Sequence, residues 1–278
     1  MFNMLIVIRI FYIIALILYA VSALKYVRAF NPKNSRLLPH RTAAANFGAV
    51  FNLLGLVTYS IYLRQAPFLG MFQGFIFAAC VLTLLFLIIS RQVESEISLG
   101  LIVMPLVSLF ALIGIFTPLE RISDPMLAPN PWFILHVSVA LFSYGAFAVA
   151  FACSILYLLL HREIKSKTLG TYFERLPSLD ELDHLTYLSV TIGFLALTVS
   201  IATGMAWTHD RLGKLLQLDI KEIITFINWL IFALYLHSRL YGGWRGRRAA
   251  WIAILGFGVV LFNFLVVTIL LSRTHSYL

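Results

Sequence analysis

Charged residues are scarce in this chain: Asp, Glu, Lys and Arg together make up 12% of the sequence, whereas hydrophobic residues make up 61%. Soluble domains carry about 25% charged residues. A soluble core formed by 278 residues cannot enclose so many apolar side chains. The composition therefore excludes an ordinary soluble protein and indicates an integral membrane protein.

Cysteine is scarce as well. The two residues, Cys80 and Cys153, lie in different apolar runs and form neither a CxxC pair nor a CxxCH haem-attachment motif. We expect both to be small apolar fillers. Walker, dinucleotide-binding and HExxH motifs are also missing from the sequence. Asp and Glu sit almost entirely outside the apolar runs, so the sequence favours non-covalent binding over bond-making catalysis.

Long apolar runs are abundant. A hydrocarbon layer ~30 Å thick needs about 20 apolar residues per helix, and eight runs meet this requirement. The sequence therefore predicts an all-α fold, with eight membrane helices in a single transmembrane domain over residues 1–278. The runs are Met4–Leu24, Ala43–Leu63, Pro67–Ser90, Ser98–Phe116, Trp132–Leu160, Leu185–Trp207, Ile223–Leu240 and Ala249–Leu271.

The first run could also be a signal peptide, because Val21-Ser22-Ala23 resembles a cleavage site. However, no basic segment precedes the run and Arg9 interrupts it. We expect an uncleaved first helix.

The positions of Lys and Arg predict the orientation in the membrane. Fourteen of these residues follow the odd-numbered runs and six follow the even-numbered runs. In membrane proteins the loops richer in Lys and Arg lie on the cytoplasmic side. Both termini should therefore lie on the non-cytoplasmic side, and the net charge of +9 reflects topology rather than a nucleic-acid partner. The fourteen are Lys25, Arg28, Lys33, Arg36, Arg41, Arg91, Arg162, Lys165, Lys167, Arg175, Arg239, Arg245, Arg247 and Arg248; the six are Arg64, Arg121, Arg211, Lys214, Lys221 and Arg273.

Three helix starts carry capping signals. Asn130 precedes a proline suited to the first helical turn. Ser178-Leu179-Asp180-Glu181 has the spacing of a capping box, and Asp219-Ile220-Lys221-Glu222 has the same spacing with an aspartate cap. We therefore expect helices to begin at these three points.

Histidines are the polar residues best placed for chemistry. His136 lies in the second turn of the fifth helix, and His275 follows the outer end of the eighth. Two neutral imidazoles at one depth can hold a metal or both axial positions of a haem iron. His237 lies inside the seventh run, where an ionisable side chain suggests function. The alternative for each is an interhelical hydrogen bond, and Tyr144 and Asn52 lie on polar stripes that could simply be packing seams.

Several motifs carry a resemblance to a known family. They are Pro131-Trp132-Phe133 with His136-Val137, Ser143-Tyr144, Arg175-Leu176-Pro177-Ser178-Leu179, Thr203-Gly204, Gly243-Trp244-Arg245-Gly246-Arg247-Arg248 and His275-Ser276-Tyr277. In order and spacing the chain resembles the cytochrome c assembly superfamily of CcsA, CcmC and HemX-type proteins, and it is most similar to the HemX and YpjD-like branch. The corresponding core would span about residues 67–278.

The resemblance implies a protein that handles haem in cytochrome c assembly or haem homeostasis, in a bacterial cytoplasmic membrane. Non-covalently bound haem b would be held at the outer leaflet by His136 and His275. His237 resembles a membrane-embedded histidine closer to the cytoplasmic side. Membrane lipids and a second assembly subunit are the implied partners.

The chain departs from the family pattern at two places. The family segment W-G-x-x-W-x-W-D-x-K-E corresponds to Leu212–Glu222, in which leucine replaces all three tryptophans. Leucine offers a macrocycle only apolar contact, whereas tryptophan also stacks and donates a hydrogen bond. Asn52 stands where many relatives carry histidine, which favours one outer haem site over a two-site relay.

The Leu212–Glu222 segment has two interpretations. It is either a degenerate haem platform or an amphipathic connector whose leucines enter the headgroup region while Arg211 and Lys214 stay in water. These two cations suit haem propionates and lipid phosphates equally well. Trp207, Asp219 and Glu222 flank or close the segment and would support a haem site.

Two other functions remain open from the sequence. A scaffold or regulator of tetrapyrrole synthesis that has lost haem presentation would act through the cytoplasmic loop at 161–184. A transporter of ions or small solutes would use Asn52, Tyr59 and His237 along a polar path, although paired charges and broken-helix signals are missing.

Overall fold

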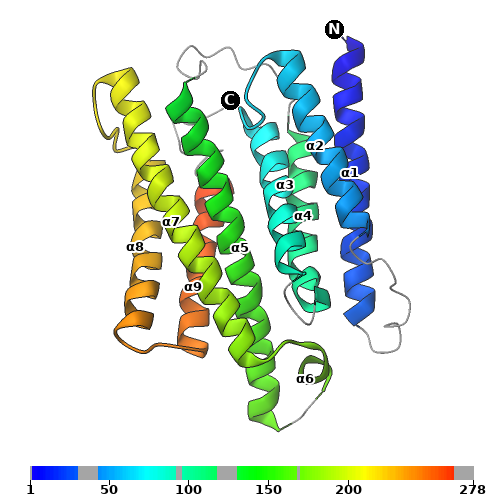
Figure 1. Cartoon of the computed structure of the whole chain (residues 1–278), viewed down its shortest axis with the longest axis vertical. Coiled ribbons are helices and arrows are strands. Elements are labelled where there is room, and N and C mark those ends of the chain that lie inside the picture. Colours follow the sequence, from blue (N-terminus) through cyan, green and yellow to red (C-terminus); the bar gives the residue numbers. More distant parts are fainter. Residues whose placement is uncertain (1, 31–42, 92–95, 118–129, 168–169, 266–278) are drawn as a thin grey trace. The chain divides into compact units, whose positions relative to one another are not determined.

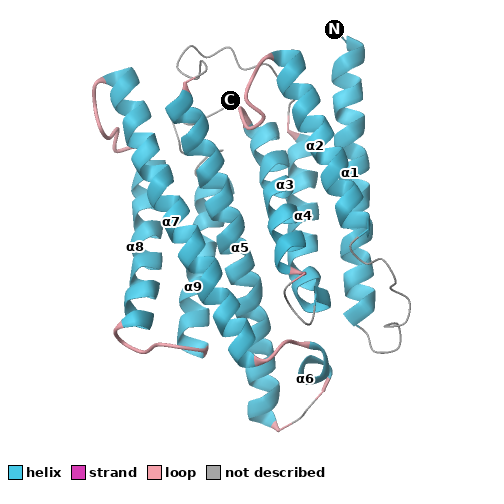
Figure 2. Cartoon of the chain, in the orientation of Figure 1, coloured by secondary structure: helices cyan, strands magenta, loops and turns pink. Residues whose placement is uncertain are grey.

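The computed structural model describes residues 2–30, 43–91, 96–117, 130–167 and 170–265. This part of the chain forms nine α-helices and contains no strand (Figure 2). Eight of the helices are long and apolar enough to cross a membrane. The prediction of an all-α, multi-pass membrane protein is confirmed, and the side on which the termini lie stays a prediction. The helices are α1 Phe2–Phe30, α2 Ala43–Leu63, α3 Met71–Ile89, α4 Glu96–Phe116, α5 Pro131–Ser166, α6 Thr171–Arg175, α7 Leu179–Leu212, α8 Ile220–Leu240 and α9 Arg247–Leu261.

The helix bounds follow the apolar runs, with two informative differences. Helices α5 and α7 contain 36 and 34 residues and extend well past their apolar runs. The short helix α6 was not predicted, because a five-residue helix has no apolar run of its own. The last predicted run continues beyond Leu265 into residues that the structure does not describe.

The chain divides into two compact units. Unit 1 comprises residues 1–121 and 159–178, and unit 2 comprises residues 122–158 and 179–278. Helix α5 contributes its first part to unit 2 and its last turns to unit 1. The prediction of a single transmembrane domain stays a prediction.

Unit 1 is built around a closed ring of four helices. Helix α1 packs against α2 and α4, and α3 packs against the same two helices (Figure 1). Tyr12, Tyr19 and Tyr26 recur every seventh residue of α1, so they share one face, and all three are fully buried. A Cβ atom at Gly48 of α2 would lie 2.7 Å from the Tyr19 ring, which shows how closely the two helices approach.

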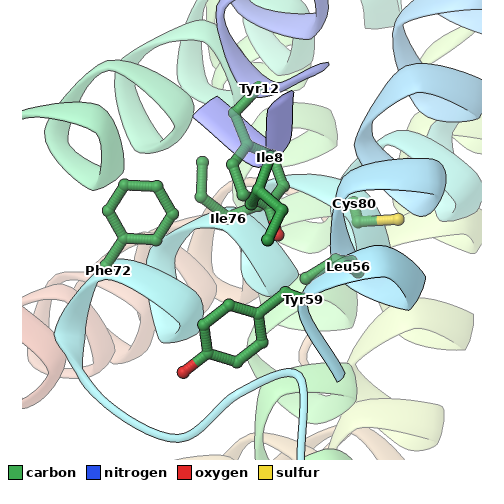
Figure 3. Close-up of a cluster of buried hydrophobic side chains, with 7 residues drawn as sticks. All are labelled: Ile8, Tyr12, Leu56, Tyr59, Phe72, Ile76 and Cys80. Atoms are coloured by element: carbon green, nitrogen blue, oxygen red, sulfur yellow. The ribbon is translucent and has the colours of Figure 1, made fainter. Parts of the chain in front are cut away.

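Asn52 belongs to this interior of unit 1. Its Nδ2 donates to the Tyr19 hydroxyl at 3.2 Å and to the Ile76 carbonyl at 3.3 Å, so it joins α2 to α1 and α3. The packing-seam interpretation of the α2 polar stripe therefore has direct support. Seven buried residues of unit 1, most of them apolar, pack together (Figure 3). They are Ile8, Tyr12, Leu56, Tyr59, Phe72, Ile76 and Cys80.

Unit 2 has two stacked phenylalanine rings at its centre. Phe147 of α5 and Phe232 of α8 lie 3.7 Å apart and 5° from parallel. A Cβ at Gly193 of α7 would lie 2.6 Å from Phe147, and one at Gly256 of α9 would lie 2.7 Å from Phe232. The two glycines therefore enclose the stack from either side. Polar residues lie toward the two ends of these helices, in two separate clusters.

Candidate functional site

His136 is the centre of the first cluster, and its imidazole is held in a defined tautomer. Nδ1 lies 2.7 Å from the main-chain oxygen of Ser200 on α7. A carbonyl oxygen can only accept, so Nδ1 carries the proton and donates it. The Ser200 hydroxyl in turn donates to the His136 carbonyl at 3.0 Å. This arrangement leaves Nε2 with a lone pair, which is the form of histidine that binds a metal.

The start of α5 fixes the position of this histidine. The Asn130 Oδ1 accepts hydrogen bonds from the amides of Trp132, at 2.9 Å, and Phe133, at 3.3 Å, so the predicted cap is confirmed. Its Nδ2 donates to Asp210 of α7 at 2.7 Å. One asparagine therefore caps α5 and joins it to the end of α7.

Gly204 makes room for the imidazole. A Cβ atom at this position would lie 2.7 Å from Nδ1 of His136. Gly204 follows Ser200 by four residues, so both lie on the same face of α7. Ser200, which orients the imidazole, and Gly204, which leaves space for it, therefore face His136 from the same side of α7.

Four further polar residues complete what we call the His136 cluster. The Tyr144 hydroxyl interacts with the side chains of Thr225 and Asn263. Asn263 donates to Thr225 at 2.9 Å, and Thr225 donates to the Lys221 carbonyl at 2.8 Å. Lys221 lies close enough for its charge to act on His136. The His136 cluster consists of His136, Tyr144, Ser200, Lys221, Thr225 and Asn263.

The chain matches a known protein family over most of its length. The family model described as "Cytochrome C assembly protein" matches residues 68–275. The chain belongs to the cytochrome c assembly protein family. The match starts well before Pro131 and includes His136, His237 and His275.

Relatives of this cytochrome c assembly protein carry the name "Cytochrome c biogenesis protein CcsA". The Heterosigma akashiwo protein is 32% identical, over 76% of each chain. The Parasynechococcus marenigrum protein is 31% identical over 82% of this chain and 84% of its own. The Chlorella vulgaris protein is 33% identical over 76% and 77%. The superfamily assignment is confirmed, and the HemX and YpjD-like branch stays a prediction.

The segment after α7 is shaped by two of the predicted supporting residues. Asp219 Oδ1 accepts from the Ile220 amide at 2.7 Å and caps α8. The Glu222 carboxylate accepts from the amides of Gln217, at 3.0 Å, and Leu218, at 2.9 Å, which lie before the cap residue. These contacts leave Leu218 69% exposed, and Arg211 and Lys214 are exposed as well. The carboxylates thus order a segment that presents leucines and cations outward.

Trp207 and His237 have surroundings that distinguish them from His136. Trp207 is buried, with its ring centroid 5.0 Å from that of Phe133, so its indole packs inside unit 2. His237 is exposed near the end of α8, with its ring 4.9 Å from that of Tyr241. It follows Lys221 by sixteen residues, or about 24 Å of helix. The structure therefore does not bring His237 and His136 together, and His275 lies outside the described residues.

The described residues contain no group of three or more His, Cys, Asp or Glu side chains that could hold a metal ion. Cys80 and Cys153 are buried free thiols.

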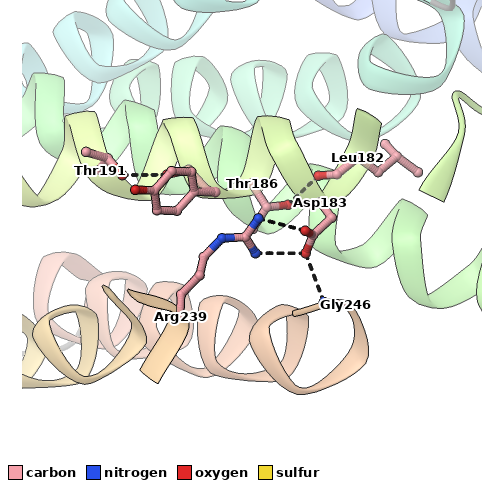
Figure 4. A network of polar contacts seen from close by, with 7 residues as sticks. Leu182, Asp183, Thr186, Thr191, Arg239 and Gly246 are labelled. Carbon is pink, nitrogen blue, oxygen red and sulfur yellow. Dashed lines mark hydrogen bonds and ion pairs between the residues drawn. The ribbon is translucent and has the colours of Figure 1, made fainter. Parts of the chain in front are cut away.

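The second polar cluster of unit 2 holds a bidentate ion pair (Figure 4). Arg239 of α8 donates to Asp183 of α7 at 3.0 and 2.7 Å, and the Gly246 amide donates to the same carboxylate at 2.9 Å. The Arg239 guanidinium also lies 4.6 Å from the centre of the Tyr187 ring. The Asp183 cluster, which comprises Asp183, Tyr187, Arg239 and Gly246, therefore joins α7, α8 and the start of α9.

Proposed function

We propose that this cytochrome c assembly protein binds haem b non-covalently at the His136 cluster, with His136 and His275 as the two axial ligands. The observation that carries the proposal is the hydrogen bond from Nδ1 of His136 to the Ser200 carbonyl. Histidines that bind metals commonly donate their second ring nitrogen in this way, which orients the ring and makes it more basic.

Cations at the same end of unit 2 suit the rest of the ligand. A haem carries two propionate carboxylates, and charge-assisted hydrogen bonds to Lys or Arg are the usual means of holding them. Lys221 lies near enough to His136 for its charge to act on the imidazole. Arg211 and Lys214 are exposed beside the Asn130–Asp210 contact that fixes the start of α5. These three residues would orient the propionates, while haem supplies an iron with two free axial positions.

The role in assembly would be transfer of haem rather than bond-making chemistry. The relatives' names state cytochrome c biogenesis. A bacterial cytoplasmic membrane and a second assembly subunit fit that process. Leucine stands at the three tryptophan positions of the family, so the 212–222 segment would shelter the macrocycle through apolar contact alone.

The apolar centre of unit 2 separates its two polar clusters, which argues against a continuous polar path for solutes. The Phe147–Phe232 stack and its two glycines fill the level between the His136 cluster and the Asp183 cluster. Solutes passing along these helices would have to separate rings that are in van der Waals contact. Transport through unit 2 is therefore the less supported function.

Haem uptake by the purified protein tests the proposal. We expect added haemin to give a Soret band that saturates at about one equivalent, and His209→Ala to behave like the unaltered protein. His209 is an exposed histidine near the same end of α7, so it controls for adventitious binding. A protein that takes up no haem would contradict the proposal and favour the scaffold function.

A further inference from the structure

The turn between α8 and α9 forms a groove that haem binding does not use. It has a cavity of about 670 Å³ and is lined by three arginines, Arg245, Arg247 and Arg248, by Trp244 and Trp251, and by two glycines. We call it the Arg/Trp groove. Ligand pockets commonly enclose about 300–1,000 Å³, so the groove can hold a small polar group.

The backbone of the groove is held in one shape rather than being an unstructured basic loop. Gly243 and Gly246 adopt φ values of 62° and 65°, which other residues rarely adopt. The Trp244 amide donates to the Ser238 carbonyl at 3.1 Å, and the Gly246 amide donates to Asp183 at 2.9 Å. Gly246 also lies against the Tyr157 hydroxyl, where no side chain would fit. Arginines that served only to orient the helices in the membrane would not need a turn of defined shape.

The charge of the groove is strongly positive. No carboxylate is among its lining residues. The nearby Asp183 is already occupied by the two guanidinium nitrogens of Arg239 and by the Gly246 amide. The Arg248 guanidinium lies 5.6 Å from the Trp244 ring centre, so the ring helps to hold this cation in place.

The groove also lies where a membrane surface is expected. Helix α8 ends at Leu240 and α9 begins at Arg247, so the groove lies where two candidate spans reach the same side of the membrane. Tyr241 is 82% exposed, and Trp244 and Trp251 are 40% and 49% exposed. Tryptophan and tyrosine concentrate at the level of lipid headgroups.

We propose that the Arg/Trp groove is a binding site for the phosphate-bearing headgroup of an anionic phospholipid. Arginine is suited to this ligand because its planar guanidinium donates two parallel hydrogen bonds to a phosphate. The exposed tryptophans contact the glycerol and upper acyl region of the same lipid. A free phosphate ion would gain nothing from these tryptophans, and the place of the groove at the ends of two candidate spans makes a lipid the favoured source of the phosphate.

Lipid retention measured by native mass spectrometry tests the proposal. The delipidated protein is offered phosphatidylglycerol and phosphatidylcholine in equal amounts. The groove variant carries Arg245→Gln, Arg247→Gln and Arg248→Gln. The matched control carries Arg162→Gln, Lys165→Gln and Lys167→Gln, which remove the same charge from exposed positions of unit 1. We expect the groove variant to lose about tenfold or more of the preference for phosphatidylglycerol, and the control variant to keep it.

Equal preference in the groove and control variants would overturn the proposal. Displacement of the lipid from the unaltered protein by millimolar inorganic phosphate would overturn the lipid assignment in favour of a soluble phosphate compound. A photoactivatable phosphatidylglycerol gives a second readout that needs no variant, and its cross-links should fall within residues 241–251. Haem uptake by the groove variant should equal that of the unaltered protein, so failure of this proposal is separable from failure of haem binding.

Discussion

Replacing His136 with alanine should abolish the Soret band that the unaltered protein acquires with haemin. The imidazole donates its Nδ1 proton to the Ser200 carbonyl, which leaves the Nε2 lone pair for a metal, and it lies near enough to Lys221 to feel its charge. Its loss removes the iron ligand, whereas the Ser200 carbonyl and the cations remain. Absorption spectroscopy during haemin titration, with the dissociation constant as the readout, measures the effect.

Two further variants separate ligation from simple damage to the fold. His136→Gly should regain a Soret band when free imidazole is supplied, because imidazole can occupy the vacated space. Gly204→Ala should displace the ring, since its Cβ would lie 2.7 Å from Nδ1. We expect it to weaken haem binding about 10- to 100-fold, as changes that misorient a metal-binding histidine do. Unaltered affinity in His136→Ala would refute the assignment of the ligand.

Replacing Arg239 with methionine should destabilise unit 2 by about 3–5 kcal/mol. The substitution removes both guanidinium donors of the Asp183 carboxylate and leaves the amide of Gly246. The side chains of Arg239 and Asp183 are only 11% and 12% exposed. A buried carboxylate without its partner has lost its hydration and gains no ion pair in exchange, so the folded state becomes less stable. Unfolding in mixed micelles, followed by the fluorescence of the five tryptophans, all of which belong to unit 2, measures the free energy of unfolding.

A double-mutant cycle makes this result specific to the ion pair. Asp183→Leu combined with Arg239→Met removes both charges and should recover most of the lost stability. Arg162→Met, at an exposed position of α5, should change stability little. A double variant no more stable than Arg239→Met alone would show that the arginine acts through packing instead of charge.

Much of the fold could be predicted because the length and hydropathy of a sequence segment are enough to identify a membrane helix. Helix α2 has the predicted bounds, and Asn130 caps α5 through the amides of Trp132 and Phe133 as expected. Asp219 caps α8 as well, but through the adjacent amide of Ile220. Prediction failed where length or apolar character was missing, as in α6 and in the polar ends of α5 and α7. Glu222 was expected to return to the amide of Asp219, but it contacts amides one and two residues earlier.

The candidate site was predictable only in part, because its decisive contacts join residues far apart in sequence. His136 could be selected as an ionisable residue within an apolar run. Its partner could not, since a main-chain carbonyl 64 residues away has no sequence signature. The Asp183–Arg239 pair, 56 residues apart, was missed for the same reason. The placement of His275 beside His136 stays a prediction.

The electron paramagnetic resonance spectrum of the haem-loaded ferric protein is the most direct test of the central claim. Two imidazole ligands split the iron orbitals strongly and give a low-spin signal, which we predict for the unaltered protein. Replacing either His136 or His275 with alanine should remove one ligand and give a high-spin signal or loss of haem. A low-spin signal that survives both substitutions, or a high-spin signal in the unaltered protein, would contradict bis-histidine ligation.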